Sequence, residues 1–204
     1  MKRMATAKEY EQTIRNYYRH GIINLWDYYL NDMYDKTFWS KGKLLEYIVL
    51  RGFELERDGC VTYPYDVRDE DMQYDGPIEQ IDGAVHVDEL HALVECKDYG
   101  KSNIKVEPLA KMRNQLARRH ASVFGMFFSA TDYTTPAQIQ VKFMAPQLII
   151  LWSKEDIDYC IRNNSFIPCM KEKYRQAVEN CEYIYPYGHI KQEDMSKYLG
   201  KPLF

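Results

Sequence analysis

Three charged residues, Asp82, Glu95 and Lys97, have types and a spacing that could do chemistry together. Two carboxylates can hold a hard divalent cation such as Mg²⁺, which prefers oxygen ligands. Such an ion polarises a phosphoryl oxygen and lowers the pKa of an attacking water, and a nearby ammonium group can stabilise the negative charge that develops. The set suits hydrolysis of a phosphate ester, provided that the fold brings the three side chains together.

A β-hairpin would bring them together. Two runs of alternating apolar and polar residues, IDGAVHV and LHALVEC, meet at the polar pair Asp88-Glu89. A turn centred there places Asp82 opposite Glu95, with Lys97 two residues further along on the same side. Like charges in opposite positions cost up to roughly 1 kcal/mol, and a cation between them removes that cost. The other face is expected to pack on the core through Ile81, Val85, Val87, Leu90, Ala92, Val94 and Cys96.

The order of these residues resembles a known signature. An Asp followed by Glu-x-Lys on the next strand is the PD-(D/E)-x-K pattern of the restriction-endonuclease-like nucleases, and here it reads Ile81-Asp82 and then Glu95-Cys96-Lys97, with Ile in place of the usual Pro. The flanking text is most similar to the Mrr-type branch, with KLLEYIVLRGF before the hairpin and SATDYTTPAQIQ after a hydrophobic strand. The resemblance covers roughly residues 43–161.

The resemblance implies a fold and an activity. The fold is a restriction-endonuclease-like α/β three-layer sandwich, with a central mixed β-sheet flanked by helices. The activity is that of a DNA endonuclease of restriction or repair type, dependent on Mg²⁺ or, in its place, Mn²⁺. Asp82 and Glu95 would bind the metal together with the Cys96 backbone carbonyl, while Lys97 would position or activate the water. The alternative is a non-catalytic nucleic-acid-binding or assembly module on the same scaffold.

A further acid, Glu46, is expected on a helix over residues 41–51, which Ser40 caps and Gly52 ends. In the resembling family a Glu on this helix often points into the active site and assists with metal or water, so Glu46 is a further catalytic candidate. The alternative is a surface glutamate in helical contact with Lys43.

A local basic segment offers a surface for DNA, although the whole chain has a net charge of −3. From Lys97 to Arg119 there are seven basic residues and two acidic ones, and much of this segment is expected to be a helix over residues 107–120. Gln115 could reach the active-site face or be an ordinary surface amide. The candidate DNA contacts are Lys101, Lys105, Lys111, Arg113, Gln115, Arg118 and Arg119.

Each site residue also has a plain structural interpretation. Asp82 before Gly83 could be a bend residue, and Glu95 with Lys97 could be a surface ion pair. Their joint occurrence on one face of apolar strands favours the catalytic interpretation. His86 and His91 should face each other across the hairpin, where they could bind a transition metal or could simply be partly exposed hairpin-end residues.

Buried strands are expected at residues 122–129 and 147–152, each followed by a helix, which indicates right-handed crossovers onto a mixed sheet. Before the hairpin, residues 53–67 are expected to form a strand with a turn at Asp58-Gly59. Residues 6–31 carry aromatic and apolar residues at helical spacing, which favours a packing face over a base-stacking surface; Gly21 could interrupt this helix.

Three parts are expected along the chain. They are an N-terminal helical extension (residues 1–39), an endonuclease-like core (40–162) and a C-terminal extension packed on the core (163–204). One helix is expected near residues 170–180. The extension could brace the domain, contact DNA or form a homodimer.

The composition is that of a soluble globular protein, with 204 residues of which 46% are apolar. The five cysteines are widely spaced without a CxxC pair, so neither a disulfide framework nor a zinc site is expected, and reduced thiols in a cytoplasm fit best. The start MKRMATAKEYEQ lacks the apolar run of a signal peptide, and no membrane partner is expected.

Overall fold

A central mixed β-sheet organises the computed structural model, which describes residues 5–68 and 76–199, with side chains in the last helix described as far as residue 193. Five strands lie in the order β1-β4-β5-β6-β7; the first three are antiparallel and the last three parallel. This confirms the expected antiparallel start and parallel crossovers. The strands are β1 Val61–Thr62, β4 Gly83–Val87, β5 Leu90–Lys97, β6 Val123–Ser129 and β7 Ile149–Trp152.

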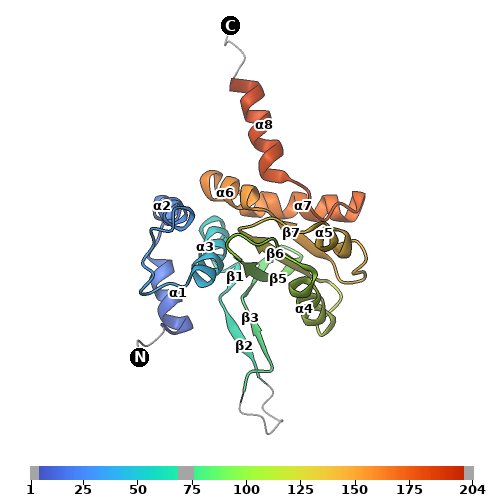
Figure 1. Ribbon diagram of the computed structural model, residues 1–204, viewed down its shortest axis with the longest axis horizontal. Coiled ribbons are helices and arrows are strands. Elements are labelled where there is room, and N and C mark those ends of the chain that lie inside the picture. Colours follow the sequence, from blue (N-terminus) through green and yellow to red (C-terminus); the bar gives the residue numbers. More distant parts are fainter. Residues whose placement is uncertain (1–4, 69–75, 200–204) are drawn as a thin grey trace.

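Helices cover both faces of this sheet, so the expected three-layer α/β sandwich is confirmed (Figure 1). On one face the core gathers residues of α1, α2, α3, α6 and α7, and on the other it gathers residues of α4 and α5. Strand residues alternate between the two cores, as Val94 and Leu93 do. The helices are α1 Ala7–Arg15, α2 Arg19–Leu30, α3 Lys41–Glu56, α4 Val106–Ala117, α5 Thr135–Val141, α6 Lys154–Asn163, α7 Phe166–Asn180 and α8 Tyr187–Leu199.

The hairpin β4–β5 has the predicted register. Gly83 pairs with Val94 and Val87 with Leu90, and the turn lies at Asp88-Glu89, where Asp88 adopts a positive φ of 51°. Of the seven residues expected on its core face, Ile81 is the exception, because it packs in the cluster on the opposite side of the sheet. The cause is an interruption of the strand at Asp82, which separates β4 from the preceding strand β3.

That preceding strand belongs to a separate ribbon. β2 (Tyr65–Val67) and β3 (Glu79–Ile81) pair with each other in an antiparallel manner and extend away from the body of the molecule (Figure 1). At Gly83 the chain passes from this ribbon into the main sheet. Only glycine fits here, because a Cβ would lie 2.7 Å from the Leu50 side chain and 3.0 Å from the Thr62 carbonyl oxygen.

The helix expected to end at Gly52 continues to Glu56, so residues 53–56 are helical and not part of a strand. Gly52 serves packing here: a Cβ at this position would lie 2.3 Å from the Phe166 ring, so only glycine lets α3 approach α7 this closely. The turn at Asp58-Gly59 follows the helix and leads into β1, and it is not a hairpin between two strands.

The N-terminal helix is broken, but at residues 16–18 and not at Gly21, which lies inside α2. Buried Arg51 explains the position of the break. Its Nη2 donates to the Arg15 carbonyl oxygen at 3.2 Å and its Nε to the Tyr17 carbonyl oxygen at 3.0 Å, which satisfies acceptors that the broken helix releases. The aromatic stripe is a packing face as expected, with Tyr10 and Tyr29 buried.

The C-terminal part holds two helices where one was expected. The second, α8, projects from the body of the molecule (Figure 1). Its start is fixed by a buried ion pair on the core, since Asp156 lies 2.8 Å from Lys173 Nζ and accepts a hydrogen bond from the Gly188 N–H. Among the described residues, no helix combines the length and the apolar character needed to cross a membrane.

Candidate active site

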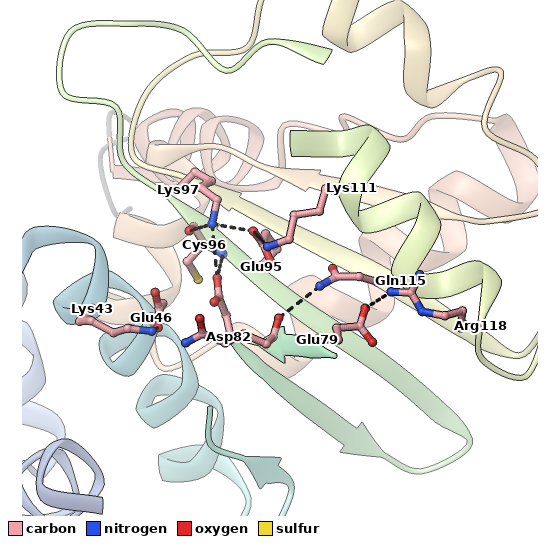
Figure 2. A network of polar contacts seen from close by, with 11 residues as sticks. Lys43, Glu46, Glu79, Asp82, Glu95, Cys96, Lys97, Lys111, Gln115 and Arg118 are labelled. Carbon is pink, nitrogen blue, oxygen red and sulfur yellow. Dashed lines mark hydrogen bonds and ion pairs between the residues drawn. The ribbon is translucent and has the colours of Figure 1, made fainter. Parts of the chain in front are cut away.

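The end of β5 and the break before β4 bring the three expected residues together. Lys97 Nζ lies 2.5 Å from Glu95 Oε1, 3.7 Å from Asp82 Oδ2 and 3.2 Å from the Cys96 carbonyl oxygen (Figure 2). The Asp82 and Glu95 carboxylates and the Cys96 carbonyl are the three groups that were predicted from the sequence to bind a metal. Their oxygens therefore converge on one point, which the Lys97 ammonium occupies in this structure.

Asp82 reaches this point as a bend residue. It lies between β3 and β4 and not within a strand, and its Oδ2 accepts a hydrogen bond from the Cys96 N–H at 3.1 Å. The backbone of β5 thus holds the Asp82 carboxylate beside the Glu-x-Lys segment. The bend interpretation of Asp82 is therefore confirmed, and the same bend brings its carboxylate to the candidate site.

Burial sets the electrostatics of the group. Glu95 is 1% exposed and Asp82 6% exposed, whereas the Lys97 side chain is 25% exposed. Burial, followed by the charge of Asp82, raises the pKa of Glu95. Burial alone would lower the pKa of Lys97, but the charges of Asp82 and Glu95 outweigh it and the pKa is raised. Lys97 is therefore protonated at neutral pH in this arrangement.

Glu46 lies beside the same group, on α3. It is 6% exposed, and its Oε2 lies 2.6 Å from Lys43 Nζ (Figure 2). Burial, and then the charge of Asp82, raises the pKa of Glu46 to about 7. The contact with Lys43 was expected, but Glu46 is not a surface residue. It belongs to the acidic cluster that we define as Glu46, Asp82 and Glu95.

The expected DNA contacts divide into three sets. Lys111 extends from α4 to within 3.5 Å of Glu95 Oε1 (Figure 2). Arg118 and Arg119 form ion pairs with Glu79 of β3, and so tie α4 to the ribbon. Lys101, Lys105 and Arg113 are exposed.

Gln115 is not a surface amide. It is 3% exposed, and its Nε2 donates to the Gln80 carbonyl oxygen at 3.3 Å. It therefore supports the strand that leads into Asp82. The helix α4 that carries it ends at Ala117, three residues before the expected end.

Sequence reasoning missed the residues that fix the end of β5. Asp98 accepts hydrogen bonds from the Tyr29 hydroxyl and from the Gly100 N–H, and lies 3.3 Å from Lys41 Nζ. The position of Asp98 directly after Lys97 is the one feature of the sequence that could have identified it. Its partners lie about 70 and 60 residues away along the chain, so no local pattern identifies them.

The donor set fits a hard divalent cation. It consists of two carboxylates and a backbone carbonyl, which are oxygen ligands of the kind that Mg²⁺ and Mn²⁺ accept alongside water and substrate phosphate. Glu95 Oε1 is buried and receives no hydrogen bond of acceptable geometry, although two ammonium groups lie within ion-pair distance. In the part of the chain that is described, no three His, Cys, Asp or Glu side chains form a ready metal cluster.

His86 and His91 contact each other, with 3.1 Å between their Nδ1 atoms. This is the cross-strand pairing that the sequence predicts. His86 is exposed and His91 partly exposed, as expected for residues near the end of a hairpin.

Comparison with known proteins gives only distant similarity. No family model matches the sequence, and no curated protein matches it. Among solved structures, protein VC1899 from Vibrio cholerae is 13% identical with a TM-score of 0.49, over 84% of this chain and 46% of that one.

Two restriction endonucleases are also similar. AspBHI, described as DNA-modification-dependent, is 14% identical with a TM-score of 0.44, over 87% of this chain and 43% of its own. MspJI, in complex with a 27-mer oligonucleotide, is 16% identical with a TM-score of 0.42, over 88% of this chain and 39% of its own. This chain spans less than half the length of each of these three proteins. At these scores the roles of Asp82, Glu95 and Lys97 must be judged from their own geometry.

Proposed function

We propose that this protein is a metal-dependent DNA endonuclease that hydrolyses phosphodiester bonds at Asp82, Glu95 and Lys97. The observation that carries the proposal is the convergence of the Asp82, Glu95 and Cys96 oxygens on a single cationic point. The PD-(D/E)-x-K pattern of the sequence supports the same reading, and its flanking text supports a place near the Mrr-type branch.

A bound Mg²⁺ or Mn²⁺ would polarise the phosphoryl oxygen and lower the pKa of the attacking water. Asp82, Glu95 and the Cys96 carbonyl would hold that ion. Lys97, protonated and fixed at the end of β5, would face the negative charge that develops on the phosphate. Lys111 of α4 brings a second ammonium group to within 3.5 Å of Glu95 Oε1 and would contact the same phosphate.

DNA would lie across the end of β5 and the start of α4. The exposed basic residues there are Lys101, Lys105, Lys111 and Arg113, which suit contacts to the phosphate backbone. Arg118 and Arg119 are less suited to this role because Glu79 already pairs with both.

Cleavage of supercoiled plasmid tests the proposal. The wild-type protein should nick or cut the plasmid with Mg²⁺ or Mn²⁺ and not with EDTA. Asp82→Ala and Lys97→Ala should each lose at least about a hundredfold in rate, as removal of a transition-state contact does elsewhere. Glu89→Gln, an exposed change in the hairpin turn, should cut like the wild type. Equal cleavage by the wild type and both site variants would contradict the proposal.

The alternative is a non-catalytic nucleic-acid-binding or assembly module. One observation favours it: Lys97 pairs with both Asp82 and Glu95, and Lys111 lies 3.5 Å from Glu95, so the two carboxylates have cationic partners without metal. Under this alternative, the protein would bind DNA in a salt-sensitive manner and would cleave none of the substrates with any divalent metal.

A further inference from the structure

A pocket of about 320 Å³ lies where α1, α3 and the β2–β3 ribbon meet. It is large enough for a flat heterocycle, since drug-sized ligands occupy pockets of about 300 to 1,000 Å³. The residues that matter for its chemistry are three tyrosines and three polar side chains: Tyr10, Tyr47, Tyr65, Lys43, Asp66 and Gln80.

Two of the tyrosines are rigid walls. The Tyr10 hydroxyl donates to the Phe38 carbonyl oxygen and the Tyr47 hydroxyl to the Ala7 carbonyl oxygen, each at 3.0 Å. Both rings are buried, with 5.5 Å between their centroids. Tyr65, on β2, also lines the pocket and is only partly buried. Of the three rings only Tyr65 has substantial exposed surface, and an aromatic ring of this kind provides a flat surface on which a nucleobase packs without regard to its identity.

The polar residues connect the pocket to the acidic cluster. Lys43 lines the pocket, and its Nζ lies 2.6 Å from Glu46 of that cluster (Figure 2). Gln80 pairs with Asp66 across the ribbon, and the chain runs from Gln80 through Ile81 directly into Asp82. A ligand that reached from the ammonium groups of Lys97 and Lys111, beside the cluster, into the pocket would need an anionic group at one end and a flat polar ring at the other. A nucleotide has this form.

The polar residues also favour a base that is not paired. The Asp66 carboxylate, whose Oδ2 lies 3.5 Å from Arg68 Nη2, offers acceptor oxygens, and the Gln80 amide can both donate and accept. A base within a duplex has already used the donors and acceptors of its pairing edge, whereas an unpaired base offers them to the protein. Taking a base out of the stack costs a few kcal/mol in an intact duplex and much less where the base is already unpaired.

We propose that this pocket receives one unpaired nucleobase of the substrate strand, next to the phosphodiester held at Asp82, Glu95 and Lys97. The inference rests on the proposed function and adds to it a preference for DNA with unpaired, bulged or single-stranded positions. Tyr65 would pack against the base, and Asp66 would contact its pairing edge.

Binding without cleavage tests this proposal. Fluorescence anisotropy in EDTA would compare a labelled duplex containing one unpaired nucleotide with the same duplex fully paired. The wild-type protein should bind the first at least about fivefold more tightly, which is the lower end of the effect of stacking one base. Tyr65→Ala and Asp66→Ala should abolish the difference, and Tyr65→Phe should keep it. Asp66 is exposed, so its variant leaves the core intact.

Tyr28→Ala is the matched control, because Tyr28 is an exposed aromatic residue on α2, outside the pocket and away from the proposed DNA surface. It should keep the preference. Equal binding of the two duplexes by the wild type, or an unchanged preference in both Tyr65→Ala and Asp66→Ala, would overturn the pocket proposal. If the protein cleaves plasmid DNA with metal but binds both duplexes equally, the pocket proposal is wrong and the nuclease proposal stands. A preference that depends on Tyr65, without cleavage of any DNA, overturns the nuclease proposal alone.

Discussion

Lys97 contacts every oxygen that the proposed metal site would use. In the absence of an ion it offsets the cost of keeping two carboxylates, both more than nine-tenths buried, close together. An arriving cation would compete with the partly exposed Lys97 ammonium for the same oxygens. The same residue thus stabilises the metal-free site and would face the phosphate in the loaded one.

This competition predicts the behaviour of Lys97→Met. Without metal the variant should lose about 2 to 3 kcal/mol of unfolding free energy. This is less than the roughly 3 to 5 kcal/mol of a fully buried broken pair, because Lys97 is partly exposed and Lys111 still lies 3.5 Å from Glu95. Mn²⁺ should then raise its melting temperature by more than it raises that of the wild type, since binding to the folded state stabilises it. Thermal denaturation with and without Mn²⁺ measures both effects. Lys101→Met, at an exposed lysine, is the control and should show neither change; a Mn²⁺ shift in Lys97→Met no larger than that of the wild type would contradict this role of Lys97.

At the scale of elements, the hairpin β4–β5 is held at both ends. Its active end is fixed by Asp98, through Tyr29 of α2 and Lys41 of α3. Its turn is fixed by Asp88, whose carboxylate lies 2.7 Å from both Lys171 Nζ and Arg57 Nη1. These contacts connect the hairpin to helices far away in the sequence, and so limit movement of the strand that carries Glu95 and Lys97.

The contacts of Asp88 predict a dependence on pH. Hydrogen bonds from Lys171 and then Arg57 lower the pKa of Asp88 from 3.8 to about 2 in the folded state. Because the folded pKa lies below the unfolded one, the stabilisation is present above pH 3.8 and is lost as the pH falls through about 2. Asp88→Asn should therefore lower the denaturation midpoint by clearly more at pH 7 than at pH 2. Urea unfolding at the two pH values measures this, and an equal loss at both would show that the charge has no role.

The sequence was sufficient for those elements whose cause is local. The register of β4–β5 follows from alternation and a polar turn, and Ser153 begins α6 through a local capping box with Asp156. The errors have causes that lie far away along the chain. Gly52 does not end α3 because Phe166 packs on it, and the first helix breaks where Arg51 binds its carbonyl groups. No pattern near Gly52 or Gly21 contains that information.

The same division holds for the site. The proximity of Asp82, Glu95 and Lys97 could be predicted from the sequence, since β5 carries Glu95 and Lys97 and Asp82 directly precedes β4. The surroundings could not: Lys111 reaches Glu95 from another helix, Glu79 neutralises Arg118 and Arg119, and the tyrosine pocket is built from segments up to about 70 residues apart. Such arrangements depend on how the layers pack.

Over the whole molecule, the acidic cluster lies where α3, α4 and the β2–β3 ribbon meet the main sheet. Lys43, Lys97 and Lys111 bring an ammonium group to it from α3, β5 and α4 respectively (Figure 2). The chain is acidic overall, but Lys101, Lys105 and Arg113 are exposed on the segment that follows β5, so an anionic polymer has a preferred place to bind beside the acidic cluster. The central claim is that the two buried carboxylates at this place bind a divalent ion.

The most direct test is a titration with Mn²⁺ in the absence of DNA, followed by the electron paramagnetic resonance of the free ion. The wild-type protein should bind Mn²⁺, and Asp82→Asn and Glu95→Gln should each weaken the binding at least about tenfold, as expected when a ligand is lost. Glu89→Gln should bind like the wild type. If all four proteins bound Mn²⁺ with the same affinity, or if none bound it, the oxygens of Asp82 and Glu95 would not form a metal site.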